Sequence, residues 1–345
     1  PDIGAIESVY SGAEFGCTDS TACNYNPLAT INDGSCILGN CVTNITQNTF
    51  STLIQTAIDS SINGDTIIVS PGTYVENLII NGKNIVLASD FLFTGDTSYI
   101  SSTIIDGNQN NSVVRLFNLD STSLIQGFKI INGYAQGSFT SNNSSGGGIR
   151  CQSSNTLINN MIISNNLADE KGGGINVFDN SYPIIDNVLL SDNTSSNGGG
   201  IRFGSNSGGV LSNSIIKNNS AVGGVGGGIE VGYTNLPLSM FNLLVVENSA
   251  ASQGGGIRIG PNTSDFDLEH VTISGNSGSA IYINNDSISL VSSIVVGSIQ
   301  LSSSGQLNII HSNTYVTMPA NPLFVDAANG DYRLSNFSPC IGAGL

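Results

Sequence analysis

Short runs of alternating apolar and polar residues follow a glycine triplet at five places in the chain. The runs read apolar, polar, apolar, as in Ile175-Asn176-Val177 and Ile257-Arg258-Ile259, which is the spacing of a strand and not of a helix. The isoleucines that open these runs, with one in a degenerate sixth copy, are spaced by 26, 26, 28, 28 and 24 residues. They are Ile149, Ile175, Ile201, Ile229, Ile257 and Ile281. A repeat of this length predicts coils that stack on one another.

A second set of positions keeps the same spacing. Asparagines close short β-branched runs in successive repeats, and they are Asn166, Asn193, Asn219, Asn248 and Asn276. Strands this short cannot form a core alone, but coils stacked about 4.8 Å apart bury one another. We expect one buried column of the isoleucines and a second of Cys151, Val177, Phe203, Val231, Ile259 and Ile283. The pattern therefore predicts an all-β fold, a parallel β-solenoid with glycine and asparagine at its corners.

These repeats resemble the right-handed parallel β-helix proteins of the pectin-lyase-like superfamily, over about residues 46–310. Before the repeats, residues 50–59 carry apolar side chains at helical spacing, and residues 64–74 follow as an apolar run ending in a turn. The resemblance implies an N-terminal capping helix at about 49–60 and then the first coil. A cap is also physically required, because a solenoid end exposes unpaired strand edge and apolar core.

The two ends of the chain also resemble parts of secreted bacterial β-helix proteins. Residues 311–345 resemble a choice-of-anchor-type closing segment, which in that family continues to a phrase like PDIGAYE. Here a matching phrase stands at the start of the chain, within an end segment of residues 1–9: Pro1, Asp2, Ile3, Gly4, Ala5 and Ile6. We expect these residues to complete the edge of a preceding module, covalently continuous or a neighbouring subunit. The alternative is a disordered cloning remnant.

Residues 10–45 form a segment rich in cysteine, aspartate and asparagine. Its four cysteines, Cys17, Cys23, Cys36 and Cys41, predict a small disulfide-stabilised unit with three possible pairings. The segment resembles a linker repeat of Bacteroidota surface proteins, which implies type IX secretion. Disulfides alone are one explanation for its order. Calcium, bound by hard oxygen ligands, is another, and the candidate ligands are Asp19, Asn24, Asn26, Asn32 and Asp33.

The composition argues against nucleic-acid-binding and membrane-spanning proteins. The 345 residues include 42 Gly and only 10% charged residues, with 9 Lys+Arg against 25 Asp+Glu and a net charge of −16. Nine cations cannot supply the basic face that nucleic-acid binding needs. No apolar run approaches the roughly 18 residues of a membrane span. The clustered cysteines in an acidic chain indicate an oxidising, extracellular setting.

One ladder of polar residues carries the candidate chemistry. We expect Arg150, Asn176, Arg202, Glu230, Arg258 and Tyr282 to point outward from successive coils. They form a candidate carbohydrate face, and Arg202, Glu230 and Arg258 are the catalytic candidates. Because successive members are about 5 Å apart, Glu230 is expected to pair with Arg202 and Arg258. The structural interpretation is favoured, in which alternating charges on a solvated sheet face avoid like-charge stacking and reduce aggregation.

Other reactive residues do not assemble into a catalytic pattern. His270 falls in register with corner asparagines at 160, 187, 213 and 242, and His311 has no carboxylate or serine phrase beside it. Cys151 is expected to be a small buried hydrophobe and Cys340 a free buried thiol. The sequence therefore favours an extracellular structural or adhesive module that assembles end to end with neighbouring copies. The alternative is a polysaccharide-binding protein, or a lyase or glycoside hydrolase that cleaves polysaccharide.

Overall fold

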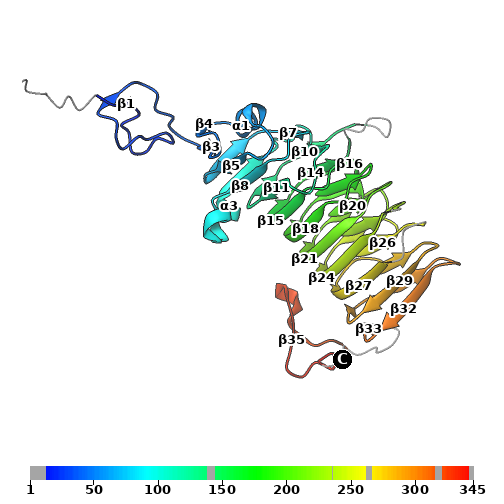
Figure 1. Ribbon diagram of the computed structural model, residues 1–345. Helices are drawn as coiled ribbons and strands as arrows, with labels where there is room; N and C mark the ends of the chain where they lie inside the picture. Colours follow the sequence, from blue (N-terminus) through cyan, green and yellow to red (C-terminus); the bar gives the residue numbers. More distant parts are fainter. Residues whose placement is uncertain (1–12, 138–143, 235, 262–265, 315–320, 342–345) are drawn as a thin grey trace, which may run out of the picture.

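The computed structural model describes residues 13–137, 144–234, 236–261, 266–314 and 321–341. The chain winds into an elongated stack of coils, with a small unit beyond the N-terminal end and a hairpin segment beside the C-terminal end (Figure 1). Nearly all strand pairs in the stack are parallel, and each strand pairs with its counterpart one coil later. The predicted all-β parallel solenoid is confirmed.

Each central coil contains one long strand that covers two faces. These strands are β15 (Leu157–Ser164), β18 (Ile184–Ser191), β21 (Gly209–Lys217), β24 (Leu238–Val246) and β27 (Phe266–Ser274). Each bends at a residue with positive φ, between 49° and 53°, which is Asn160, Asn187, Asn213, Asn242 or His270. Asparagine tolerates this conformation better than other non-glycine residues. The prediction that His270 occupies a corner asparagine position is confirmed.

Shorter strands complete the same sheet at both ends of the stack. Toward the N-terminus they are β5 (Thr66–Val69), β6 (Gly72–Val75), β8 (Val86–Ser89), β9 (Thr103–Asp106), β11 (Leu124–Gln126) and β12 (Lys129–Ile131). Toward the C-terminus they are β29 (Ser287–Val291), β30 (Ile294–Val295), β32 (Gln306–Ile310) and β33 (Asn313–Thr314).

Two further sheets close each coil. A five-strand sheet contains β13 (Tyr134–Ala135), β16 (Leu167–Lys171), β19 (Thr194–Asn197), β22 (Ser220–Ala221) and β25 (Ser249–Ala250). A nine-strand sheet contains β7 (Leu78–Asn81), β10 (Val114–Phe117), β14 (Ile149–Gln152), β17 (Ile175–Phe178), β20 (Ile201–Phe203), β23 (Ile229–Val231), β26 (Ile257–Ile259), β28 (Ile281–Ile283) and β31 (Ile299–Leu301). The glycine triplets lie at the corner between these two sheets, and their first glycine has positive φ.

The two predicted buried columns are present, and so is the row of repeated asparagines from Asn166 to Asn276, which we call the asparagine ladder. Ile149 pairs in register with Ile175, and the column continues coil by coil to Ile281, every member 0% exposed. The buried asparagines donate from Nδ2 to the Oδ1 of the next asparagine at 3.0 Å in each case. This ladder satisfies amide groups that would otherwise be costly to bury.

A cap covers the N-terminal end. Helix α1 (Ile54–Ser60) buries Ile54, Ala57 and Ile58, and the antiparallel pair β3 (Val42–Asn44) and β4 (Thr49–Ser51) lies beside it. The capping helix predicted at about 49–60 therefore begins later. Residues 49–51 pair with β3 instead, consistent with the preference of threonine and phenylalanine for strands. Two short helices, α2 (Phe91–Thr94) and α3 (Ser98–Ser102), form one insertion between β8 and β9.

The cysteine-rich unit stands beyond this cap (Figure 1). It contains the parallel pair β1 (Phe15–Gly16) and β2 (Ile31–Asn32) and two disulfides, Cys17–Cys36 and Cys23–Cys41. At the other end, β34 (Phe324–Asp326), the 3₁₀ helix η2 (Ala327–Asn329) and β35 (Asp331–Leu334) form a hairpin. Within the described residues, no helix is long and apolar enough to cross a membrane. The predicted inter-module residues, Pro1, Asp2, Ile3, Gly4, Ala5 and Ile6, lie outside the described part of the chain.

Candidate functional site

The six predicted ladder residues stand in one row across the nine-strand sheet. Arg150 pairs with Asn176, Asn176 with Arg202, Arg202 with Glu230, Glu230 with Arg258, and Arg258 with Tyr282. Arg115 precedes them in the same row. We call the row from Arg115 to Tyr282 the arginine ladder. Sequence reasoning missed Arg115 because β10 has no glycine triplet before it, although Val114-Arg115-Leu116 shows the same alternation.

The arginine ladder is largely buried and is not the solvated face that the sequence predicts. Arg150 is 4% exposed and Arg202 8%. The guanidinium of Arg150 lies 5.3 Å from the centre of the Phe117 ring and 5.2 Å from that of Phe178, which is cation–π distance from both. Aromatic side chains on the same sheet face therefore cover the first part of the ladder.

Glycines leave the space that the side chains of Arg202 and Arg258 occupy. At Gly204 a Cβ would lie 2.1 Å from Nη1 of Arg202, and at Gly260 it would lie 2.6 Å from Nη1 of Arg258. These glycines follow β20 and β26, where earlier coils carry Gln152 and Phe178. The arginine side chains consequently lie along the sheet surface over glycine backbone.

Glu230 joins two neighbouring coils through ion pairs. Its Oε2 accepts a hydrogen bond from Nε of Arg202 at 3.0 Å, and its Oε1 lies 3.5 Å from Nη1 of Arg258. The side chain of Glu230 is 8% exposed. The predicted pairing with both arginines is confirmed, and it leaves the carboxylate engaged with cations on both sides.

The arginine ladder has a positive formal charge in an acidic chain, because it holds four arginines and one glutamate. Four of the five arginines in the sequence belong to the ladder. Burial lowers the pKa of Arg115, and burial followed by the nearby Arg115 lowers the pKa of Arg150. Burial and then Arg202 also lower the pKa of Lys171, which Glu170 and Glu230 oppose. The lowered pKa values reflect partly desolvated cations held close together.

His270 and the two free cysteines do not belong to the arginine ladder. His270 lies at the corner of β27, where its Nδ1 is 3.7 Å from Oε1 of Glu269. Cys151 points into the core, as predicted, and burial raises its pKa to about 12. Such a thiol stays protonated and unreactive near neutral pH. Cys340 is also a buried free thiol, as predicted.

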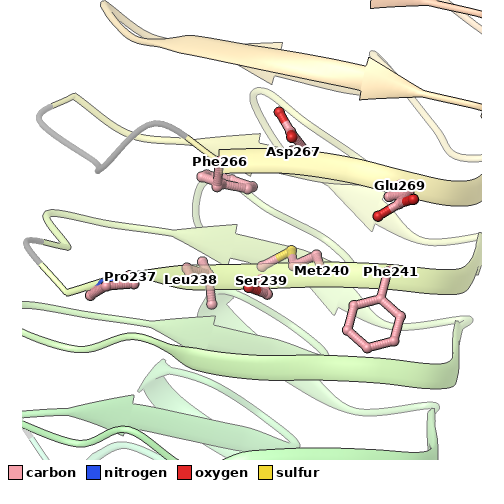
Figure 2. A pocket seen from close by; sticks show the side chains of 8 residues that line it. All are labelled: Pro237, Leu238, Ser239, Met240, Phe241, Phe266, Asp267 and Glu269. Carbon is pink, nitrogen blue, oxygen red and sulfur yellow. The ribbon is translucent and has the colours of Figure 1, made fainter.

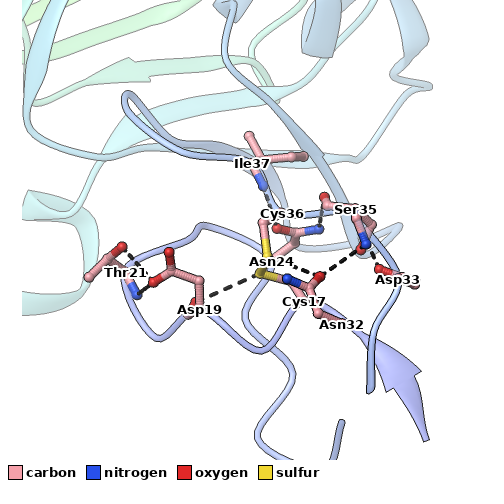
Figure 3. The surroundings of a disulfide bond; sticks show 10 residues. Cys17, Asp19, Thr21, Asn24, Asn32, Asp33, Ser35, Cys36 and Ile37 are labelled. Atoms are coloured by element: carbon pink, nitrogen blue, oxygen red, sulfur yellow. Dashed lines mark hydrogen bonds between the residues drawn. A yellow bond between two sulfur atoms is a disulfide. The ribbon is translucent and has the colours of Figure 1, made fainter. Parts of the chain in front are cut away.

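Four of the five predicted calcium ligands, Asp19, Asn24, Asn32 and Asp33, lie around the Cys17–Cys36 disulfide (Figure 3). Asp19 accepts hydrogen bonds from the backbone and hydroxyl of Thr21, and Asp33 accepts from the backbone of Ser35. The hydroxyl and backbone of Thr21 lower the pKa of Asp19, and the side chain and then the backbone of Ser35 lower the pKa of Asp33. The amide oxygens of Asn24, Asn26 and Asn32 each accept a backbone N–H.

The two aspartates among the candidate calcium ligands lie apart from each other (Figure 3). Asp19 and Asp33 lie on opposite sides of the Cys17–Cys36 bond (Figure 3). Within the described residues, no three His, Cys, Asp or Glu side chains are placed to hold a metal ion. Calcium binding stays a prediction, and comparing the thermal unfolding of the unit with added calcium and with a chelator tests it.

Hollows lined by described residues occur on the outside of the stack, and two of them lie near the elements discussed above. The larger, of about 590 Å³, lies on the outer face of β24 and β27 and is lined by Phe241, Asp267 and Glu269 among others (Figure 2). The smaller, of about 360 Å³, lies between α1 and β7 and is lined by Asp59, Ile79 and Lys83 among others. Ile79 precedes Arg115 in the same row, so this hollow lies at the N-terminal end of the ladder.

A family of known proteins with the same type of coil matches part of the sequence. The family described as "Right handed beta helix region" matches residues 148–317. The chain folds as a right-handed parallel β-helix. No curated protein matches the sequence.

Two solved structures resemble this β-helix. One is a pectin methylesterase in complex with hexasaccharide VII, which is 10% identical, with a TM-score of 0.36 over 85% of this chain and 92% of that chain. The other is Escherichia coli ybhc, which is 12% identical, with a TM-score of 0.34 over 76% of this chain and 81% of that chain.

Proposed function

We propose that this β-helix is an extracellular structural or adhesive module of a bacterial surface protein, which joins neighbouring copies end to end. One observation carries the proposal. The charges of the candidate site are engaged between coils, because Glu230 binds Arg202 and Arg258 and all three are largely buried. A carboxylate held between two guanidiniums is poorly suited to accept a substrate proton. In this arrangement it cross-links the stack.

The disulfide unit supports the location. The unit contains two disulfides within residues 17–41. Disulfides persist in an oxidising environment and are rare in cytosolic proteins. The resemblance to Bacteroidota surface proteins, with their linker repeats and anchor segments, makes the outer surface of such a cell our proposed location.

An activity assay tests the proposal against cleavage. The full chain is incubated with acidic polysaccharides, and released reducing ends and unsaturated uronides are measured. We expect no release above that of a heat-denatured sample. Release that is lost in Glu230→Gln, with the fold retained by circular dichroism, would show that the ladder is catalytic and would replace the structural proposal.

The alternative function is binding of an anionic polysaccharide, favoured by the concentration of four of the five arginines on one sheet face. Within the described residues, Nε of Arg115 and Nε of Arg258 are buried without a hydrogen-bond partner. Titration calorimetry with polygalacturonate tests this function. Binding that Arg115→Gln weakens about tenfold, and that the exposed control Arg333→Gln leaves unchanged, would support it. The absence of binding in the wild type would exclude it for this polymer.

A further inference from the structure

The two ends of the β-helix differ in how they are covered. The cap formed by α1, β3 and β4 closes the N-terminal end. At the other end, β31 pairs with β28 and β32 pairs with β29. Among the described residues, β28 is the one strand paired with β31 and β29 the one strand paired with β32, so the opposite edge of each is unpaired. We call this face, formed by β31 and β32, the open end.

Core side chains become exposed at the open end. Leu301 is 46% exposed, whereas Ile283, on which it stacks, is 0% exposed. Leu307 and Ile309 continue buried columns and are only partly buried. Unpaired strand edges beside exposed apolar side chains are a template for pairing with another chain.

Within residues 321–341, the contacts of the C-terminal segment lie away from β31 and β32. Its contacts lie beside β33, where Nδ2 of Asn313 donates to Sγ of Cys340 at 2.6 Å. They also lie along the side of the stack, where the hydroxyl of Tyr332 donates to Oε1 of Glu247 at 3.0 Å. The described hairpin therefore lies beside the stack and not across its end (Figure 1).

The cysteine-rich unit carries the matching surface at the opposite end of the molecule. Leu28 is 73% exposed and Phe15 63%, and Tyr25, Ile31 and Leu38 are exposed as well. The unit is tied to the first coil where Nδ2 of Asn40 donates to the carbonyl of Thr73. It stands beyond the cap, away from its own coils (Figure 1). It also contributes a parallel strand pair, β1 and β2, which matches the strand direction of the β-helix.

The two apolar surfaces cannot meet within one chain. Eight strand spacings separate β7 from β31 in the nine-strand sheet, which is roughly 38 Å at about 4.8 Å each. We propose that the cysteine-rich unit of one copy covers the open end of a second copy. The inference rests on the proposed structural function and names the surfaces through which copies join. A contact between two different surfaces that does not close on itself generates a filament.

Charge supports this occupant. Residues 299–310, which include both strands of the open end, contain no charged residue although the chain carries −16. The cysteine-rich unit carries Glu14, Asp19 and Asp33 and no Lys or Arg over residues 13–41, so the uncharged open end is where this acidic unit meets the least repulsion. Raising the ionic strength should strengthen association, because salt screens the long-range repulsion while apolar contact persists.

The test uses sedimentation velocity on the full oxidised chain over a range of concentrations. Leu28→Glu alters the cysteine-rich unit, Leu301→Glu alters the open end, and Ile184→Glu is a control on the side of the stack with 43% exposure. We expect wild type and control to form open-ended oligomers. We expect each end variant to weaken association about tenfold or more. If Leu301→Glu lowers the melting temperature, the exposed Ser303→Glu at the same end replaces it.

Mixing the two end variants gives the decisive measurement. Each variant retains one intact surface, so an equimolar mixture should form dimers that grow no further, while each variant alone stays monomeric. A wild type that is monomeric at every concentration, or a mixture that stays monomeric, would overturn the inference. So would association of Leu28→Glu alone at wild-type strength. The proposed function fails separately, through polysaccharide cleavage that depends on Glu230.

Discussion

At the scale of single residues, the interior of the coils depends on buried polar groups that satisfy one another. Asn193 donates from Nδ2 to the carbonyl of Ile163 and to Oδ1 of Asn219. Its own Oδ1 accepts from the backbone and side chain of Asn166. Each buried amide of the asparagine ladder therefore bonds to the coil before it and to the coil after it. Loss of one amide leaves polar groups without partners in both neighbouring coils.

Replacement of a ladder asparagine should be strongly destabilising. We expect Asn219→Leu to lower the free energy of unfolding by about 2–4 kcal/mol, because its neighbours keep buried polar groups without partners. Urea unfolding followed by circular dichroism measures the effect. The control is Asn242→Gly at an exposed corner with φ of 53°, where a change below about 0.5 kcal/mol is expected. Equal effects at both positions would contradict the role given to the buried ladder.

Replacement of Glu230 should also destabilise the fold strongly, because it removes a buried ion pair. Glu230→Gln leaves Arg202 and Arg258 buried without their counter-charge, so we expect a loss of about 3 kcal/mol in unfolding free energy. The matched control is Asp331→Asn, whose partner Arg333 is 81% exposed, and there a loss below about 1 kcal/mol is expected. Glu230→Gln with wild-type stability would show that this ion pair does not hold the coils together.

The register of the arginine ladder could be predicted from the sequence, but its burial could not. The apolar, polar, apolar alternation after each glycine triplet assigns Arg202 and Glu230 to one face. Burial depends on Gly204 and Gly260, whose missing side chains leave room for the arginines. It also depends on Phe178, which reaches Arg150 from the next coil. Such contacts arise between neighbouring coils, and the residues that make them do not recur at a regular spacing in the sequence.

At the scale of elements, the cap depends on the first coil for its stability. Helix α1 has 7 residues and is too short to be stable alone. The carboxylate of Glu76 accepts from the backbone of Ile54 and Gln55 at its start, and Nζ of Lys83 donates to the carbonyls of Ile58 and Asp59 at its end. Helical spacing predicted the helix, but these long-range partners fix its bounds.

The turn after the cap should make stability depend on pH. Burial alone would raise the pKa of Asp65, but hydrogen bonds from the backbone of Ile62 and from Asn44 and Gln47 outweigh it, and the pKa is lowered. The folded state therefore gains stability from ionised Asp65 above the unfolded pKa near 4, and loses it as the pH falls through the lowered folded value. Urea unfolding at pH 6 and about pH 3 should show this loss, and the loss should be smaller in Asp65→Asn. An identical pH dependence in the variant would contradict the assignment.

At the scale of the whole molecule, two bodies are stabilised by different physics. The β-helix buries continuous columns and needs no covalent cross-link, whereas residues 13–41 expose Phe15, Leu28 and Leu38 and contain both disulfides. The sequence could predict this division, because cysteines cluster in one segment and glycine triplets in another. It could not choose between three pairings, since pairing depends on which loops meet in space.

Reduction of the disulfides should separate the two bodies. Disulfides stabilise mainly by limiting the unfolded chain, and a unit this small has little core to replace them. We expect a reducing agent to open residues 13–41 to limited proteolysis while the thermal unfolding midpoint of the β-helix moves by less than about 3 °C. Cys151 is the internal control, because its buried thiol, with a pKa raised to about 12, should react with iodoacetamide only after the coils unfold. Early labelling of Cys151, or loss of the β-helix transition on reduction, would show that the unit holds the stack together and would contradict the division into two bodies.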